Sequence, residues 1–128
     1  MSTFAITVSP AERMVVAVAK GKTDFASAET AMDEIARLLE GHADWGILID
    51  GRGSGYAPSA SEIKQHIASP SVQKVRRHRM ALVVEPGLRF GIARMFASLM
   101  EATGGEAHAS VDPDEARAWL ANRGANAT

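Results

Sequence analysis

The sequence contains no cysteine among its 128 residues. Disulfides, thiol catalysis and thiolate metal sites are therefore excluded, and the composition fits a reducing compartment. No apolar run approaches the roughly 20 residues that span a bilayer, and residues 1–6 lack the basic region and apolar stretch of an export signal. We therefore expect a chain that is neither exported nor embedded in a membrane, and a cytoplasmic location.

Excess charge of either sign is also absent. The formal net charge is −1, and the one notable basic run, residues 74–79, is short. Nucleic-acid affinity comes from counterion release summed over many cations on one face, so we expect no nucleic-acid partner. The run is better explained as cations at a helix end, where they complement the dipole. Weak repulsion between copies and a sheet edge to cover lead us to expect a homodimer.

The composition is that of one globular domain. Hydrophobic residues make up 46% of the chain and charged residues 23%, close to the averages for globular proteins. Two independent cores would leave each half too small to bury enough apolar surface. We therefore expect a single domain over residues 1–128, with its core between about residues 4 and 122.

Hydrophobic periodicity and turn residues divide the chain into strands and helices. The five predicted strands cover residues 4–8, 13–19, 45–50, 80–84 and 106–110. The first two are expected to form an antiparallel hairpin, with Pro10 in the turn between them. Apolar residues at helical spacing predict two longer helices over residues 24–40 and 88–102.

Two further helices are predicted from their cap motifs. Ser59 and Glu62 have the capping-box spacing of a helix that should run to about residue 68, and Pro70 can restart it for a turn or two. Asp112 and Pro113 supply the N-cap and the first residue of a last helix. The order of elements predicts an α/β fold with a central mixed, mostly parallel sheet, an N-terminal antiparallel hairpin and about four helices.

The glycine-rich loop over residues 51–56 follows a predicted strand without being a nucleotide-binding motif. Tyr56 stands where a dinucleotide fingerprint needs glycine, and the Gly-Lys-Ser/Thr ending of a Walker loop is missing. A nucleophile elbow is excluded because Arg52 and Tyr56 occupy the glycine positions that flank Ser54. The loop is either a flexible turn or a loop that contacts a ligand or partner.

Asp50 is the best single candidate for chemistry, because ligands of open α/β sheets gather at the carboxyl ends of the strands. Its alternative role is to bond the amides of the following loop or Arg52. Acid pairs such as Glu29 with Asp33 are expected on solvated helix faces rather than as a general acid and base.

The histidines lie in four separate elements without the spacing of metal ligands, so we expect neither a metal site nor another cofactor. Each is interpreted as a surface or interface imidazole: His42, His66, His78 and His108. Met95 and Met100 are interpreted first as core residues, although exposed methionines would suit an adaptable binding surface. Trp45 and Trp119 are expected to fill core or helix-packing space.

Four segments together resemble one family. Residues 47–52 (ILIDGR), 79–86 (RMALVVEP), 90–96 (FGIARMF) and 114–120 (DEARAWL) are similar to the SpoIIAA-like (STAS/SEC14-like) family of the STAS superfamily. The resemblance runs from about Phe4 to Leu120, and its motifs are structural rather than catalytic. It implies a mixed sheet backed by helices, no enzymatic activity, and the binding of proteins or small apolar ligands.

The resemblance also draws attention to Ser59. In anti-sigma factor antagonists of this superfamily, a serine at the start of the second helix is phosphorylated and switches partner binding. Ser59 falls nearest that place and is the candidate phosphoacceptor, although Pro58 stands where those proteins have an aspartate. The alternative interpretation is a helix cap without a regulatory role.

Our leading hypothesis is a noncatalytic binding or regulatory module that contacts a protein partner. Its surface would comprise the loop over residues 50–61 and the start of the helix at residue 88, with Arg94 as a further charge and these binding residues: Asp50, Arg52, Ser54, Tyr56, Ser59, Arg89 and Phe90. The alternative is a SEC14-like carrier of a small apolar ligand or lipid, lined by Phe90, Met95 and Phe96. An enzyme is not expected, because no nucleophile, base and orienting group can be assembled from the spacing.

Overall fold

The computed structural model describes residues 3–122. Its strands are β1 (Phe4–Ser9), β2 (Met14–Ala19), β3 (Gly46–Asp50), β4 (Met80–Val83) and β5 (Ala107–Ser110). Its helices are α1 (Phe25–Leu38), α2 (Ala60–Ala68), α3 (Pro70–Val75), α4 (Leu88–Ala102) and α5 (Pro113–Ala121). Within this range, no helix combines the length and the apolar character needed to cross a membrane.

The strands form one five-stranded sheet in the order β1-β2-β3-β4-β5. β1 and β2 are antiparallel, and each later strand is parallel to its neighbour. The predicted α/β class, the N-terminal hairpin and the mostly parallel mixed sheet are thus confirmed. The parallel strands are joined through helices, as the connection between parallel neighbours requires.

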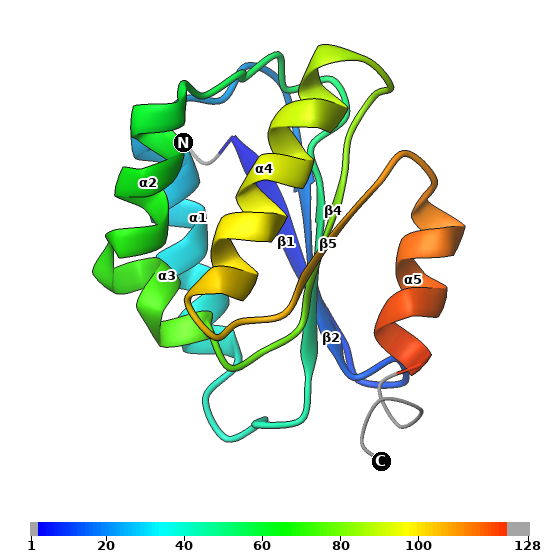
Figure 1. Cartoon of the computed structure of the whole chain (residues 1–128). Helices are drawn as coiled ribbons and strands as arrows, with labels where there is room; N and C mark the ends of the chain where they lie inside the picture. Colours follow the sequence, from blue (N-terminus) through cyan, green and yellow to red (C-terminus); the bar gives the residue numbers. More distant parts are fainter. Residues whose placement is uncertain (1–2, 123–128) are drawn as a thin grey trace.

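The two faces of the sheet are covered unequally. Four helices, α1 to α4, lie on one face, and α5 lies alone on the other (Figure 1). Side chains alternate along β3, so Ile47 and Ile49 pack in the core beneath the four helices. Leu48 packs on the opposite side with Ala116 and Leu120 of α5. Asp50, the next residue on that side, is directed to the face that carries α5.

α2 and α3 are separate helices because of the residues between them. The predicted capping box starts α2: Ser59 Oγ accepts from the Glu62 N–H at 3.1 Å, and Glu62 Oε1 accepts from the Ser59 N–H at 3.0 Å. Ser69 is both the C-cap of α2 and the N-cap of α3, and Pro70 is the first residue of α3. The proline has no N–H to continue α2, so the restart is a distinct helix and the described residues hold five helices rather than about four.

Gly46 brings α5 close to the sheet. A Cβ atom at this position would lie 2.9 Å from Leu120 Cδ2 and 3.3 Å from the carbonyl oxygen of Arg79. Arg79 adds a second tie, because its Nη1 donates to the carbonyl oxygen of Trp119 at 2.9 Å and its guanidinium lies 3.9 Å from the centre of the Trp119 ring. The end of α5 therefore packs directly on the start of β3.

We expect α5 to depend on its N-cap. Asp112 Oδ1 accepts from the Asp114 N–H at 2.9 Å, so Asp112→Ala leaves a first-turn amide without its partner. The free energy of unfolding should fall by about 1 kcal/mol, measured by urea denaturation. Asp112→Asn is the matched control and should keep most of that stability, because asparagine caps equally well. Equal loss in both variants would contradict the capping role.

Candidate functional site

The helix layer does not close over the carboxyl ends of the central strands. Ile47 and Met80 are 0% exposed, as expected for central strands covered by helices. Ile49 and Leu82, two residues further along the same strands and on the same side, are only partly buried. This is the edge of an α/β sheet at which ligands usually bind.

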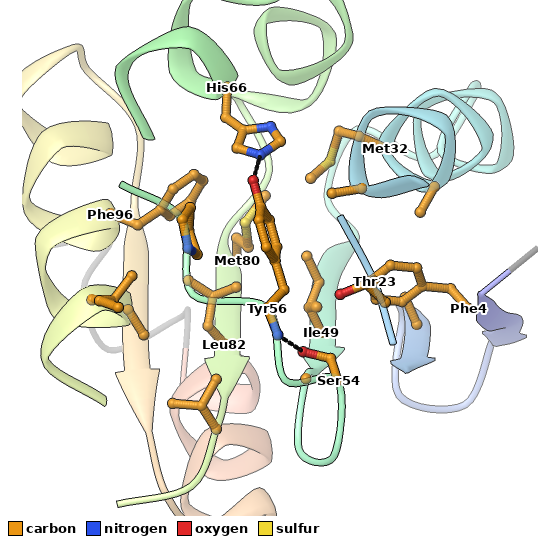
Figure 2. Close-up of a pocket in the computed structure, with 18 of the residues that line it drawn as sticks. Phe4, Thr23, Met32, Ile49, Ser54, Tyr56, His66, Met80, Leu82 and Phe96 are labelled. Carbon is orange, nitrogen blue, oxygen red and sulfur yellow. Dashed lines mark hydrogen bonds between the residues drawn. The ribbon is translucent and has the colours of Figure 1, made fainter. Parts of the chain in front are cut away.

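A cavity of about 150 Å³ lies at this edge, between the sheet and helices α1, α2 and α4 (Figure 2). Most of its wall is apolar and is formed by side chains from the sheet and from helices α1, α2 and α4: Phe4, Met32, Ile35, Ile49, Ile63, Met80, Leu82, Ile92 and Phe96. Five residues with polar side chains also line it: Thr23, Ser54, Tyr56, His66 and Arg89. The site is thus an apolar space with a few fixed polar groups, which is the usual composition of a small-molecule pocket.

Tyr56 reaches into the cavity from the loop that joins β3 to α2. Gly53 and Gly55, on either side of Ser54, have φ values of 83° and 70°, a backbone region that favours glycine. The turn that they allow buries Ser54, which is 2% exposed, and directs the Tyr56 ring toward His66. In Figure 2 the ring passes between Phe96 and Met80 on one side and Met32 and Ile49 on the other.

Arg89, in the first turn of α4, holds this loop in place. Its Nε donates to the carbonyl oxygen of Tyr56 at 2.9 Å, its Nη1 to that of Gly51 at 2.9 Å, and its Nη2 to Ser54 Oγ at 2.7 Å. It also forms an ion pair with Glu85. A hydrogen bond from the Gly53 N–H to Glu85, together with Arg89, lowers the pKa of that carboxyl. The predicted site residue Arg89 therefore holds in place the loop that brings Ser54 and Tyr56 to the cavity.

A pair formed by the half-buried Glu29 and the buried His66 lies at the opposite end of the cavity. His66 is 7% exposed, and its Nδ1 lies 2.6 Å from Glu29 Oε2. The other oxygen of Glu29 accepts from Ser71 Oγ at 2.9 Å, and the Phe25 ring stacks on the imidazole at 4.2 Å between centroids. Burial works against the Glu29 carboxylate, but the hydrogen bonds from His66 and Ser71 outweigh it and lower its pKa.

Tyr56 connects this pair to a second carboxylate. Its hydroxyl oxygen lies 3.3 Å from His66 Nε2 and 3.4 Å from Glu62 Oε2. Burial and the nearby Glu62 carboxylate raise the pKa of Tyr56 to about 12, so the phenol keeps its proton at neutral pH. Glu29, His66, Tyr56 and Glu62 thus form a continuous polar chain, called here the acid–imidazole chain.

The structure separates the residues that the sequence placed in one binding surface. Ser54, Tyr56 and Arg89 meet at the cavity. Asp50 and Arg52 pair with each other instead, with Arg52 Nη2 2.7 Å from Asp50 Oδ2, and Asp50 Oδ1 also accepts from the Arg52 N–H at 3.1 Å. Asp50 therefore has the structural contacts that were its alternative role, and it points away from the cavity.

The other predicted contact residues lie outside the cavity wall. Ser59 is exposed at the start of α2, where its hydroxyl serves the capping box. Phe90 is half-buried, with the Arg94 guanidinium 5.9 Å from the centre of its ring. Phe90, Met95 and Phe96 were expected to line an apolar site. Of these three, only Phe96 lines the cavity.

Three expectations from the sequence are wrong. Glu29 is half-buried rather than solvated, and His66 is buried rather than at the surface or an interface. The two side chains pack against each other. Met95 is not a core residue, since it is 44% exposed. The helical spacing held a usable signal for His66, which falls on the same face as the buried Ile63 and Ile67.

We compared the chain with protein-family models, with curated proteins and with solved structures, and none of the three comparisons found a match. The function proposed below therefore depends on the geometry of the cavity and on the resemblance described above.

Proposed function

We propose that this chain is a noncatalytic SpoIIAA-like binding module of the STAS superfamily, and that its ligand is a small, mainly apolar molecule held in the cavity. Two features support the family assignment: the sequence segments that resemble the family, and an N-terminal hairpin leading into a parallel sheet with interspersed helices. We favour a small ligand over a protein partner, because the apolar side chains around the cavity are not fully packed against one another.

The observation that carries the proposal is the incomplete cover of Ile49 and Leu82. Protein interiors are packed about as densely as organic crystals, and apolar surface left uncovered sacrifices about 25 cal/mol per Å². Here the carboxyl ends of β3 and β4 face an apolar space of about 150 Å³ instead of being packed directly against helix side chains. A ligand in that space would supply the missing contacts.

The volume limits the size of the ligand. An apolar cavity of about 150 Å³ holds a molecule the size of benzene. A whole lipid would need several times that space, and hence a displacement of α2 or α4. We therefore narrow the ligand class to small rings and short chains.

The surroundings of Ser54 support binding rather than catalysis. An activated serine needs a general base that accepts its proton. Ser54 Oγ instead accepts hydrogen bonds from Arg89 Nη2 at 2.7 Å and from the Tyr56 N–H at 3.2 Å. The imidazole that lines the cavity is His66, and its hydrogen-bonding partners are Glu29 and Tyr56 rather than Ser54, with Nδ1 donating to Glu29. The proposed module accordingly needs no cofactor.

Toluene is a suitable probe of the cavity. We expect saturable binding to the wild type by NMR titration, with the largest shifts for methyl groups of Ile49, Leu82 and Ile92. Ala93→Leu should weaken binding at least about tenfold, because Ala93 is 6% exposed in the cavity wall and a larger side chain there occupies the space. The control is Ala118→Leu on the exposed side of α5, which should leave the affinity unchanged. A wild type that does not bind toluene would contradict the proposal.

A second candidate function, docking of a protein on the loop over residues 50–61, is favoured by the exposure of Ser59. Ser59→Asp keeps a good N-cap, so the free energy of unfolding should change by well under 1 kcal/mol and the melting temperature should change little. The affinity of any partner docked on this loop should fall, because the new charge must be desolvated or repelled. Pull-down followed by affinity measurement tests this, with Ser98→Asp on α4 as the control. Equal affinities for wild type and Ser59→Asp would remove the docking hypothesis.

A further inference from the structure

The acid–imidazole chain has one hydrogen-bond acceptor more than its donors can satisfy. Carboxylates only accept, so the short contact to Glu29 requires that His66 Nδ1 be the donor. In the neutral imidazole Nε2 is then an acceptor. The Tyr56 hydroxyl has a single proton but lies between two acceptors, His66 Nε2 at 3.3 Å and Glu62 Oε2 at 3.4 Å. One of the two acceptors is therefore left without a donor.

The proton of Tyr56 belongs on the side of Glu62. A hydrogen bond to a charged acceptor is stronger than one to a neutral acceptor, and the two distances are nearly equal. His66 then keeps an open lone pair on Nε2. His66 is among the residues that line the cavity, whereas Glu62 is not. A buried acceptor without a donor is unfavourable, so a donor placed in the cavity beside Nε2 would be stabilised.

We propose that His66 Nε2 accepts a hydrogen bond from a hydroxyl or N–H group of the bound molecule. This inference rests on the proposed function and specifies it: the ligand is a small neutral ring or chain with an apolar body and one hydrogen-bond donor. Carboxylates are excluded from this end of the cavity, because Glu29 and Glu62 flank it with negative charge. The guanidinium of Arg89 does not offset that charge, since Glu85 and three further acceptors already occupy it.

Phenol and toluene provide the test, because they differ only in a hydroxyl in place of a methyl group of similar size. The measured quantity is the ratio of their dissociation constants, taken by NMR titration for each variant. Glu62→Gln is the main variant. Its amide oxygen can keep the bond to the Ser59 N–H, while its amide N–H donates to the Tyr56 oxygen and turns the Tyr56 proton toward Nε2. The open acceptor is then filled.

In the wild type we expect phenol to bind about as tightly as toluene or more tightly. In Glu62→Gln phenol should weaken about tenfold relative to toluene, the effect of one lost hydrogen bond. Glu115→Gln, which faces His108 at 2.8 Å on the other side of the sheet, is the matched control and should leave the ratio at its wild-type value. Benzoate should bind the wild type more than about tenfold more weakly than phenol.

A second variant distinguishes Nε2 from the Tyr56 hydroxyl itself. Tyr56→Phe removes the competing proton, so the preference for phenol should be kept or increased. Loss of the preference in Tyr56→Phe, or an equal ratio in the wild type and Glu62→Gln, would overturn the assignment to His66 while leaving the cavity as a toluene site. Failure of toluene to bind the wild type would overturn the proposed function as well.

Discussion

Met80→Ala should lower the free energy of unfolding by about 3 to 5 kcal/mol, in the upper part of the range for such truncations. Met80 is 0% exposed on β4, and its side chain is part of the cavity wall. The space left by the truncation would join the existing cavity of about 150 Å³, so the neighbouring side chains cannot collapse into it. Chemical denaturation measures the effect.

Met95→Ala is the matched control for this experiment. Met95 is 44% exposed on α4, so the same truncation there removes little buried surface and should change stability by less than about 0.5 kcal/mol. Similar losses in the two variants would show that the cost does not come from the cavity wall. The enlarged cavity gives a further check, because Met80→Ala should also accept probes bulkier than toluene.

Glu29→Ala should lower the free energy of unfolding by about 2 to 4 kcal/mol. The substitution leaves the buried donor His66 Nδ1 without its acceptor and removes the carboxylate acceptor of Ser71 Oγ, which keeps its 3.2 Å contact with Ser69 Oγ; His66 and Ser71 are 7% and 4% exposed. Glu115→Ala removes an exposed partner of His108 and should cost less than about 1 kcal/mol. Equal costs would indicate that the contacts of Glu29 contribute no more than a surface pair.

The contribution of Glu29 should also depend on pH in a defined direction. Its pKa is lowered in the folded protein, so folding favours the carboxylate over the acid. The stabilisation is fully present above the pKa of the unfolded chain and is lost as the pH falls through the lowered folded value. The difference in stability between wild type and Glu29→Ala should therefore shrink in acid. A difference that is constant from neutral to acidic pH would contradict the stabilisation of the Glu29 carboxylate by its hydrogen bonds from His66 and Ser71.

Much of the fold could be predicted from local patterns. The hairpin, the capping box at Ser59 and the helix that the structure places at Leu88–Ala102 each follow from residues close together in the chain. Pro70 marks the position of the restart in the sequence, but its separation into a second helix was not predictable from spacing. Whether a one-residue interruption bends a helix or ends it depends on the packing of the following turn, which spacing alone does not describe.

The candidate site was only partly predictable for a similar reason. The glycine-flanked loop identified Ser54 and Tyr56, because backbone conformation there is encoded locally. The pair of Glu29 and His66 joins α1 to α2. The residues around either one in its own helix do not indicate which residue it will contact. Packing of the helices against one sheet creates that contact, so the pairing of this acid with this imidazole depends on tertiary structure that the sequence of neither helix describes.

The close approach of α5 to the sheet has a consequence for how the sequence can vary. Because the space beside Gly46 is filled by Leu120, a side chain at position 46 and the leucine at position 120 compete for the same volume. A substitution at one position is therefore tolerated only with a matching change at the other: a residue larger than glycine at position 46 requires a residue smaller than leucine at position 120. Among related chains, the two positions should covary although they lie far apart in the sequence.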